Sequence, residues 1–189
     1  MRVLFFDTET TGVPTGPIDP ATWPSIVQIA FLMVDTDKND KHTEHDFIIK
    51  FDGAIENAHI HGITERRNKV CGHDFKDVYA ILQLYFDEAD MVVAHNIDFD
   101  LKMLHVECLR SGIEYKQPTN QYCTMKRCTD MCGIYKNGRL KWPTLTELHE
   151  FLFDEGPPVA HEALADVYSC VRCFYKVFWK KNPPKKFCS

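Results

Sequence analysis

The sequence predicts an α/β domain in which a mixed sheet is covered by helices. Apolar runs bounded by turn residues come first and indicate strands at residues 3–7, 26–34 and 46–50. From residue 75 onward the apolar residues recur at helical spacing, interrupted by one further strand pattern at residues 91–95. Strands followed by an alternation of helix and strand are typical of a sheet with helices packed against it.

Proline and glycine mark where these elements end. The segment VPTGPIDPATWP, residues 13–24, contains four prolines and is predicted to be a loop, because proline fixes φ and lacks a backbone N–H. Helices are predicted after it, at residues 75–86, 101–112, 144–153 and 164–178. Gly112 is suited to closing the second of them, because glycine readily adopts the left-handed conformation that often ends a helix.

The length of the chain is that of one domain, with no internal repeat and no linker. We expect residues 1–180 to form that domain and the basic, proline-broken residues 181–189 to be a mobile tail. With 44% hydrophobic and 26% charged residues, the composition is that of a globular protein. No apolar run reaches the roughly eighteen residues of a membrane span, and no signal peptide is recognisable, so we expect an intracellular, cytoplasmic protein.

The formal net charge of -5 argues against a protein that grips nucleic acid through a broad basic surface. Nucleic-acid chemistry is still compatible with it, because divalent cations held by a group of acids would reverse the local charge and attract a phosphodiester. The eight cysteines are expected to be reduced thiols, since a chain of this length folds without disulfides. Cys123, Cys128 and Cys132 lack the paired C-x2-C spacing of a zinc ribbon, so packing is favoured over structural zinc.

Two acids end the first predicted strand. In FFDTETTG, residues 5–12, Asp7 and Glu9 are two positions apart, and such side chains point to the same side of an extended strand. Close carboxylates raise each other's pKa unless a cation lies between them. A divalent metal resolves the repulsion, although two solvated acids at a strand end are the commoner meaning of D-x-E alone.

A second acidic segment is AHNIDFD, residues 94–100, which follows a predicted strand. Open α/β sheets bind their ligands at the carboxyl ends of strands, so an acid here is well placed for a site. Asp98 and Asp100 are equally suited to the first turn of a helix, where the helix dipole stabilises them. Taken alone, this segment does not decide between the two.

The third segment is AHEALADV, residues 160–167. His161 and Asp166 would lie about 140° apart on an ideal helix and could not share a face. Pro157 and Pro158 disfavour helix upstream, which leaves His161 near the helix start and free to reach inward.

In combination and in this order, the motifs FxDTETTG, HNxxFD and HxALxD resemble the DEDDh (DnaQ-like) family of 3′→5′ exonucleases, of the proofreading-subunit type. The similarity covers nearly the whole chain, including IVQIA at 26–30, IHGIT at 60–64 and KWPTLTEL at 141–148. The five residues that name the family are all present: Asp7, Glu9, Asp100, Asp166 and His161. The resemblance implies a ribonuclease H-like fold whose five-stranded mixed sheet begins with an antiparallel meander, with residues 91–95 as the fourth strand and 122–124 as the fifth.

The resemblance also assigns two divalent cations to the four acids, and all-carboxylate ligation favours Mg²⁺ or Mn²⁺ over zinc. Such ions can hold an attacking water and stabilise the leaving 3′ oxygen. His161 would be the general base, a task suited to a side chain that titrates near neutral pH. Thr10 would meet the 3′-hydroxyl, and His61 and Phe99 would lie near the terminal base, although Phe99 is equally suited to a core.

The function predicted is therefore metal-dependent 3′→5′ hydrolysis of nucleic acid, with single-stranded DNA ends favoured, to nucleoside 5′-monophosphates. The partner required is a nucleic acid with a free 3′ end, and a DNA polymerase is the protein partner that a proofreading subunit would have. Two alternatives stay open: an RNA-trimming exoribonuclease of the same family, and a module that binds nucleic acid or a polymerase without catalysis. The sequence predicts neither the oligomeric state nor a preference for single or double strands.

Overall fold

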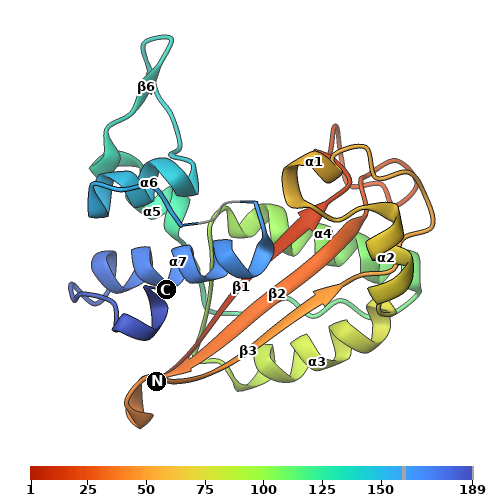
Figure 1. Ribbon diagram of the computed structural model, residues 1–189, viewed down its shortest axis with the longest axis horizontal. Coiled ribbons are helices and arrows are strands. Elements are labelled where there is room, and N and C mark those ends of the chain that lie inside the picture. Colours follow the sequence, from red (N-terminus) through yellow and green to blue (C-terminus); the bar gives the residue numbers. More distant parts are fainter. Residues whose placement is uncertain (159–160, 189) are drawn as a thin grey trace.

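The computed structural model describes residues 1–158 and 161–188, which form a five-stranded mixed sheet with helices on both faces (Figure 1). The strands are β1 (Arg2–Thr10), β2 (Ile26–Asp35), β3 (Lys41–Ile48), β4 (Met91–Ala94) and β5 (Gln121–Cys123). Their order across the sheet is β3-β2-β1-β4-β5. β1 pairs antiparallel with β2 and parallel with β4, so it is the central strand.

Helices α3 and α4 pack on one face of the sheet and α7 packs on the other, with α5 and α6 against α7 (Figure 1). The helices are α1 (Ala58–His61), α2 (Glu65–Cys71), α3 (Phe75–Glu88), α4 (Ile97–Ser111), α5 (Thr124–Cys132), α6 (Leu145–Phe153) and α7 (Ala163–Val177), with 3-10 turns η1 (Thr36–Lys38) and η2 (Lys185–Phe187). A hairpin of β6 (Tyr135–Lys136) and β7 (Arg139–Leu140) lies between α5 and α6. Within the described residues, no helix combines the length and the apolar character needed to cross a membrane.

The side chains of β1 build two cores because they alternate between the faces of the sheet. Leu4 and Phe6 belong to the core under α3 and α4, whereas Val3 and Phe5 belong to the core under α7. All four are at most 1% exposed. The central strand is therefore packed on both sides, and the residues that follow Phe6 are held in a fixed position relative to α4 and α7.

One arginine of α4 holds the proline-rich loop between β1 and β2. Arg110 donates hydrogen bonds to the main-chain carbonyl oxygens of three loop residues, Pro20, Trp23 and Pro24. The same guanidinium pairs with Glu107 (2.7 Å), whose carboxylate accepts a hydrogen bond from the first backbone N–H of β2 (3.1 Å). The loop and the start of β2 are thereby attached to α4.

The expected mixed sheet is confirmed, including the antiparallel meander of β1, β2 and β3. A fifth strand was expected at residues 122–124, and β5 lies one residue earlier and runs parallel to β4. The prediction of a third strand at residues 46–50 is wrong in position, because β3 spans Lys41–Ile48. β3 is an edge strand whose sequence, KHTEHDFI, is mostly polar and exposed, so only its end has an apolar signal. The helices α1, α2 and α5 and the β6–β7 hairpin were not predicted; the hairpin has a signal in the Asn-Gly of YKNGRL.

The prediction of a mobile tail is wrong around Phe187. This side chain is 1% exposed and packs against the rings of His42, Tyr168 and Tyr175. Burying one large aromatic side chain is enough to anchor a short segment. The division into a domain of residues 1–180 and a tail of 181–189 stays a prediction.

Replacing Phe174 of α7 by alanine is expected to lower the free energy of unfolding by about 3–5 kcal/mol, because the side chain is fully buried and its loss leaves a cavity. Its ring lies 5.2 Å from that of Phe5, 5.1 Å from that of Tyr122 and 4.7 Å from that of Phe178. Urea unfolding measures the change. Phe178→Ala is the matched control, since Phe178 is 39% exposed at the edge of the same stack. An equal loss for the two variants would contradict the central place of Phe174 in the core.

Candidate active site

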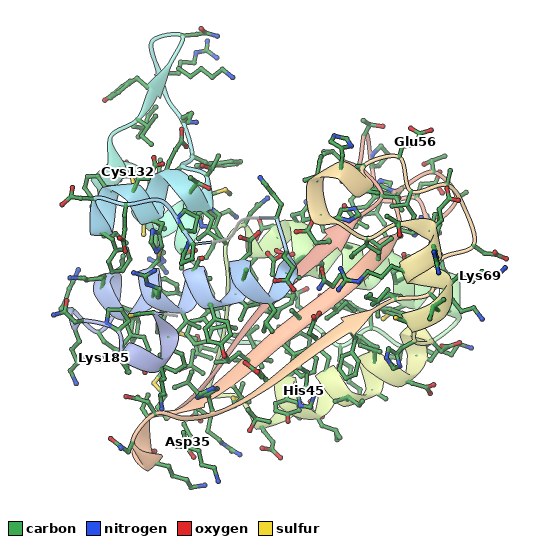
Figure 2. All side chains as sticks on the ribbon, in the orientation of Figure 1. Asp35, His45, Glu56, Lys69, Cys132 and Lys185 are labelled. Carbon is green, nitrogen blue, oxygen red and sulfur yellow. The ribbon has the colours of Figure 1, made fainter. Side chains whose placement is uncertain are left out.

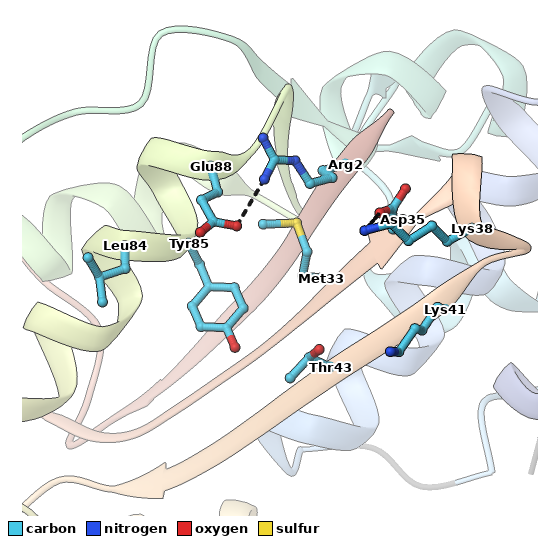
Figure 3. A pocket seen from close by; sticks show the side chains of 9 residues that line it. All are labelled: Arg2, Met33, Asp35, Lys38, Lys41, Thr43, Leu84, Tyr85 and Glu88. Carbon is cyan, nitrogen blue, oxygen red and sulfur yellow. Dashed lines mark hydrogen bonds and ion pairs between the residues drawn. The ribbon is translucent and has the colours of Figure 1, made fainter.

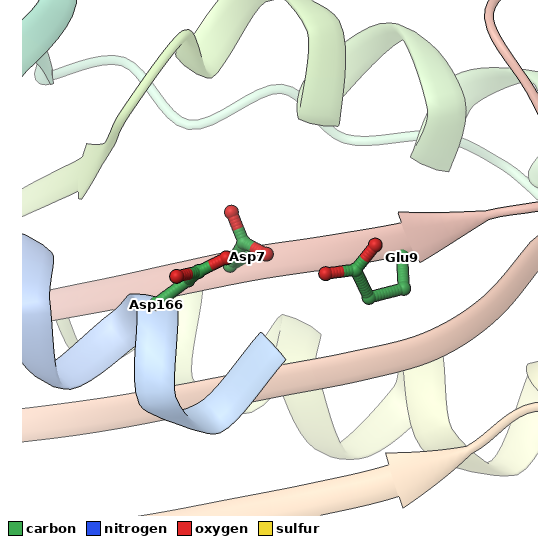
Figure 4. A group of neighbouring side chains, drawn as sticks. All are labelled: Asp7, Glu9 and Asp166. Carbon is green, nitrogen blue, oxygen red and sulfur yellow. The ribbon is translucent and has the colours of Figure 1, made fainter. Parts of the chain in front are cut away.

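Three carboxylates converge near the C-terminal end of β1. Asp7, Glu9 and Asp166 each offer a carboxylate oxygen, and these oxygens all lie within 4.8 Å of one another. Figure 4 shows Asp7 and Glu9 on β1 and Asp166 reaching toward them from the first turn of α7. Among the described residues, no other set of three or more histidine, cysteine, aspartate or glutamate side chains has this geometry.

The register of the sheet explains why these acids meet. Asp7 and Glu9 continue the face of β1 that packs under α7, and the β1–β2 ladder shifts its register directly after Glu9. Gln28, opposite Glu9 on β2, accepts a hydrogen bond at Oε1 from the N–H of Ala163 (3.4 Å). Since Ala163 is the first residue of α7, this bond holds the start of the helix above the acids.

Asp100 lies beside this cluster but approaches from the other face of the sheet. It is 2% exposed in the first turn of α4, and its Oδ1 accepts hydrogen bonds from the hydroxyl (2.8 Å) and the backbone N–H (3.2 Å) of Thr8. β4 pairs with β1 only as far as Phe5, so the end of β1 is open to α4. The structure thus groups three of the predicted acids, Asp7, Glu9 and Asp166. The fourth, Asp100, is linked to the same strand by its hydrogen bonds to Thr8.

Burial raises the pKa of every acid in this group. It holds the pKa of Asp7 well above its ordinary value, and the charges of Asp100, Asp166 and Glu9 raise it further. Burial, followed by the charge of Asp166, raises the pKa of Glu9 to about 7. Burial also raises the pKa of Asp166 to about 6 and that of Asp100 to about 8. At neutral pH these carboxyl groups therefore resist being ionised together.

A divalent cation fits this donor set. The donors are carboxylate oxygens, which suit hard ions. Within the part of the chain that the structure describes, none of the four acids forms an ion pair with a lysine or an arginine. A buried carboxylate without a countercharge is unfavourable, so a bound cation is the partner that these groups lack.

His161 lies just before α7 and not within it. Its φ is +62°, its side chain is exposed, and its backbone N–H donates a hydrogen bond to Oδ2 of Asp166 (3.2 Å). This placement agrees with the expectation that the two residues do not share a helical face. The backbone keeps His161 next to Asp166 while the imidazole points into solvent, outside the group of three acids.

Thr10 and His61 are joined through Asn57. The amide of Asn57 donates a hydrogen bond to the carbonyl oxygen of Thr10 (2.6 Å), and Asn57 directly precedes α1, which ends at His61. His61 is 3% exposed, and its Nδ1 accepts a hydrogen bond from the N–H of Ile63 (3.2 Å), so Nε2 carries the proton of the neutral ring. Burial lowers the pKa of His61 and keeps it neutral. Its buried Nε2–H has no partner among the described residues.

Phe99 lines a groove of about 290 Å³ beside Asp100. The other residues that line this groove are Pro14, Gly16, Trp23, Asn96, Asp98, Lys102, Lys126 and Trp142. Phe99 is half-buried and also packs against the core under α4. Both expected roles of this side chain, in the core and in a substrate groove, are compatible with its position.

Several polar residues that surround the acids were not predicted from the sequence. Thr8 holds Asp100, and Asn57 connects Thr10 with α1. Gln28 bridges β3 and α7, since its Nε2 also donates to Asp46 (2.7 Å). A signal existed for Gln28, which is the single polar residue in the apolar run IVQIA.

A larger cavity, of about 430 Å³, lies at the opposite end of β1 (Figure 3). Arg2, the first residue of β1, lines it, and its guanidinium pairs with Glu88 (2.9 Å). Lys38 in the same cavity pairs with Asp35 (3.2 Å). Because none of the four acids lines this cavity, it is not the candidate active site.

Several solved nucleases share this fold. E. coli exonuclease I in complex with a dT13 oligonucleotide matches with a TM-score of 0.72 at 20% identity, over 99% of this chain and 42% of that one. Exonuclease I from Methylocaldum szegediense matches with a TM-score of 0.67 at 20% identity, over 95% and 41%. Cell-death related nuclease 4 (CRN-4) matches with a TM-score of 0.71 at 18% identity, over 96% and 64%. The expected ribonuclease H-like fold is confirmed, and this chain spans about two fifths of the length of the exonuclease I chains.

No curated protein sequence matches the chain. The model of the exonuclease family RNase_T matches residues 4–174, a span that runs from β1 into α7 and contains all four acids and His161. Since this match covers most of the chain, the chain belongs to the RNase_T exonuclease family.

Proposed function

We propose that this chain is a metal-dependent 3′→5′ exonuclease that hydrolyses single-stranded DNA ends to nucleoside 5′-monophosphates. The observation that carries the proposal is the cluster of Asp7, Glu9 and Asp166 in a member of an exonuclease family. Structures of E. coli exonuclease I in complex with dA16 and dT13 oligonucleotides favour single-stranded DNA as the first substrate to test. A polymerase partner and a cytoplasmic location stay predictions from the sequence.

Asp7, Glu9, Asp100 and Asp166 would hold two divalent cations, Mg²⁺ or Mn²⁺. When bound, such ions supply Lewis-acid stabilisation of a phosphate and make a water molecule more acidic. The raised pKa values support this role, because a cation replaces the protons that the crowded carboxyl groups would otherwise retain. Thr8 keeps Asp100 oriented toward β1 through its two hydrogen bonds.

His161 would accept the proton of the attacking water. Its position directly before α7 and its backbone bond to Asp166 keep it close to the acids, and its exposed ring can receive a proton and release it to solvent.

Thr10, His61 and Phe99 would select the 3′ end of the strand. The unpartnered Nε2–H of neutral His61 is a donor for an acceptor atom of the terminal nucleotide. Phe99 offers a half-buried ring on which a base can stack. Because Asn57 ties Thr10 to α1, the strand end and the helix that carries His61 are positioned together.

The direct test is incubation with 5′-labelled oligonucleotides in Mg²⁺ or Mn²⁺. We expect a ladder of products that shortens from the 3′ end, and no ladder from Asp7→Asn, which keeps the size of the side chain but removes its charge. Single-stranded DNA, single-stranded RNA and duplex DNA are compared side by side. A faster ladder on RNA would replace DNA by RNA as the substrate, and no product from any substrate would leave a binding module as the function.

His161→Ala is expected to lower the turnover number by about 10²-fold, because the general base is lost. The rise in melting temperature on adding Mn²⁺ should stay unchanged, since the acids are intact. His73→Ala, which removes an exposed histidine outside the site, is the control. Turnover equal to that of the control would exclude His161 as the base.

In EDTA, the free energy of unfolding of the wild type relative to Glu9→Gln should fall as the pH rises from about 4 to about 8. The pKa of Glu9 is about 7 in the folded protein, above its ordinary value of about 4 in an unfolded chain. Between these values the folded state binds more protons than the unfolded state, so raising the pH disfavours folding. Adding Mg²⁺ should remove this pH dependence of the stability of the wild type relative to Glu9→Gln.

Urea unfolding at a series of pH values, with EDTA and then with Mg²⁺, measures this dependence. A wild-type profile that rises relative to Glu9→Gln across the same range would contradict the crowding of the acids.

A further inference from the structure

The β6–β7 hairpin projects away from the rest of the described protein (Figures 1 and 2). Its two strands are joined by Asn137 and Gly138, whose φ angles are 54° and 73°. Positive φ at both central residues defines a type I′ turn, which matches the twist of the strands and gives a well-formed two-residue hairpin. One more backbone hydrogen bond (2.9 Å), from Lys141 to Ile134, closes its base. The projection is therefore an ordered arm.

The arm concentrates positive charge and exposed aromatic rings. Its sequence, YKNGRLKW at residues 135–142, contains three basic residues and no acid, in a chain whose net charge is -5. Tyr135 is 68% exposed and Trp142 is 61% exposed. Within the described residues, Lys136 and Arg139 form no ion pair, whereas Lys141 pairs with Glu147 (2.7 Å).

The base of the arm opens onto the groove that Phe99 lines. Trp142 lines this groove together with Lys102 and Lys126. Lys126 pairs with Asp98, but Lys102 has no ion pair among the described residues. Unpaired cations and aromatic rings thus continue from the arm toward the helix that carries Asp100.

A hydrogen bond attaches the arm to the segment between β4 and α4. Nε2 of His95 lies 3.0 Å from the carbonyl oxygen of Pro143, the residue after Trp142. A carbonyl oxygen only accepts, so Nε2 carries the proton, and Nδ1 faces the hydroxyl of Thr124 (3.0 Å). The arm is therefore held in a fixed relation to α4, which starts two residues after His95.

We propose that the β6–β7 arm, Trp142 and Lys102 form a track for the nucleotides on the 5′ side of the strand end that occupies the active site. This inference rests on the proposed function. Phosphates contact Lys136, Arg139 and Lys102, and a base stacks on Trp142. Positive side chains interleaved with exposed aromatic rings are the features that bind single strands without regard to sequence. Cations held by the four acids would attract only the reacting phosphate, so the rest of the strand depends on such local positive side chains.

The test is the binding of fluorescently labelled oligo(dT) of about 15 nucleotides, measured by anisotropy in EDTA so that no hydrolysis occurs. Lys136→Ser/Arg139→Ser should raise Kd by about 10-fold and reduce the slope of log Kd against log salt by about 1.4, because each phosphate contact on a single strand contributes about 0.7. Trp142→Ala should raise Kd by about 10-fold and leave the slope unchanged, because stacking releases no counterions.

Two matched control variants remove a comparable charge or a comparable aromatic ring at sites away from the arm. Lys38→Ser/Lys41→Ser removes the same charge at the other end of the sheet (Figure 3), and Phe151→Ala removes a 49% exposed ring from α6. Neither should change Kd. The proposed track would be overturned if the arm variants had the wild-type Kd and salt slope. It would also be overturned if the controls lost as much affinity as the arm variants.

Cleavage assays separate this inference from the proposed function. In Mg²⁺ both arm variants should lose kcat/KM on the long oligonucleotide, but Lys136→Ser/Arg139→Ser should keep the wild-type rate on a dinucleotide, which is too short to reach the tip of the arm. If the wild type cleaves nothing yet binds more tightly than the arm variants, the track stands without the exonuclease. If the wild type cleaves and the arm variants match it on the long substrate, the track is wrong and the exonuclease stands.

Discussion

The mutual repulsion of half-buried carboxylates is the constraint on which this end of the molecule depends. Asp7, Glu9 and Asp166 are held within 4.8 Å of one another, although burial already disfavours the charge of each. Such an arrangement opposes folding unless other contacts offset it. The apolar residues directly before Asp7 in β1 provide the compensating stabilisation. Val3 to Phe6 are at most 1% exposed and pack on both faces of the sheet.

Because side chains alternate along β1, helices on both faces of the sheet contribute acids to the site. Asp7 and Glu9 face α7, which contributes Asp166 directly. Thr8 faces the other way and takes up Asp100 from α4. Beyond Phe5, β4 no longer covers the edge of β1. Helices on opposite faces of the sheet can therefore place acids close together at this end of the strand.

Much of this arrangement could be predicted from the sequence, because it follows local patterns. The strand that ends in Asp7 and Glu9 and the helix behind His161 are both visible as apolar periodicity with a boundary signal. The order of the motifs then predicted the family correctly. The polar residues that support the acids were not predictable in the same way. Thr8 and Asn57 act through hydrogen bonds to residues 92 and 47 positions away, and no local pattern encodes such contacts.

The elements that were missed share a physical reason. α1 and α2 bury few apolar side chains, and β3, which was predicted at the wrong position, has only its last residue buried, so the apolar periodicity of all three is weak. α5 ends in a cluster with Cys128, Cys173 and Leu148, where small sulfur side chains replace the usual aliphatic stripe. In each case the element is stabilised by what packs on it from elsewhere in the chain.

Arg110 has a consequence for how the loop between β1 and β2 can vary. Three of its hydrogen bonds end on main-chain carbonyl oxygens, which every amino acid provides. The side chains of that loop can therefore change over evolution, or be replaced in a redesigned protein, while the loop stays attached to α4. Among the loop residues that line the groove beside Phe99, Pro14 can vary in this way, whereas Gly16 has a φ of 75° and Trp23 is buried in the core. The lining of that groove can accordingly be altered at such a position without disturbing the four acids.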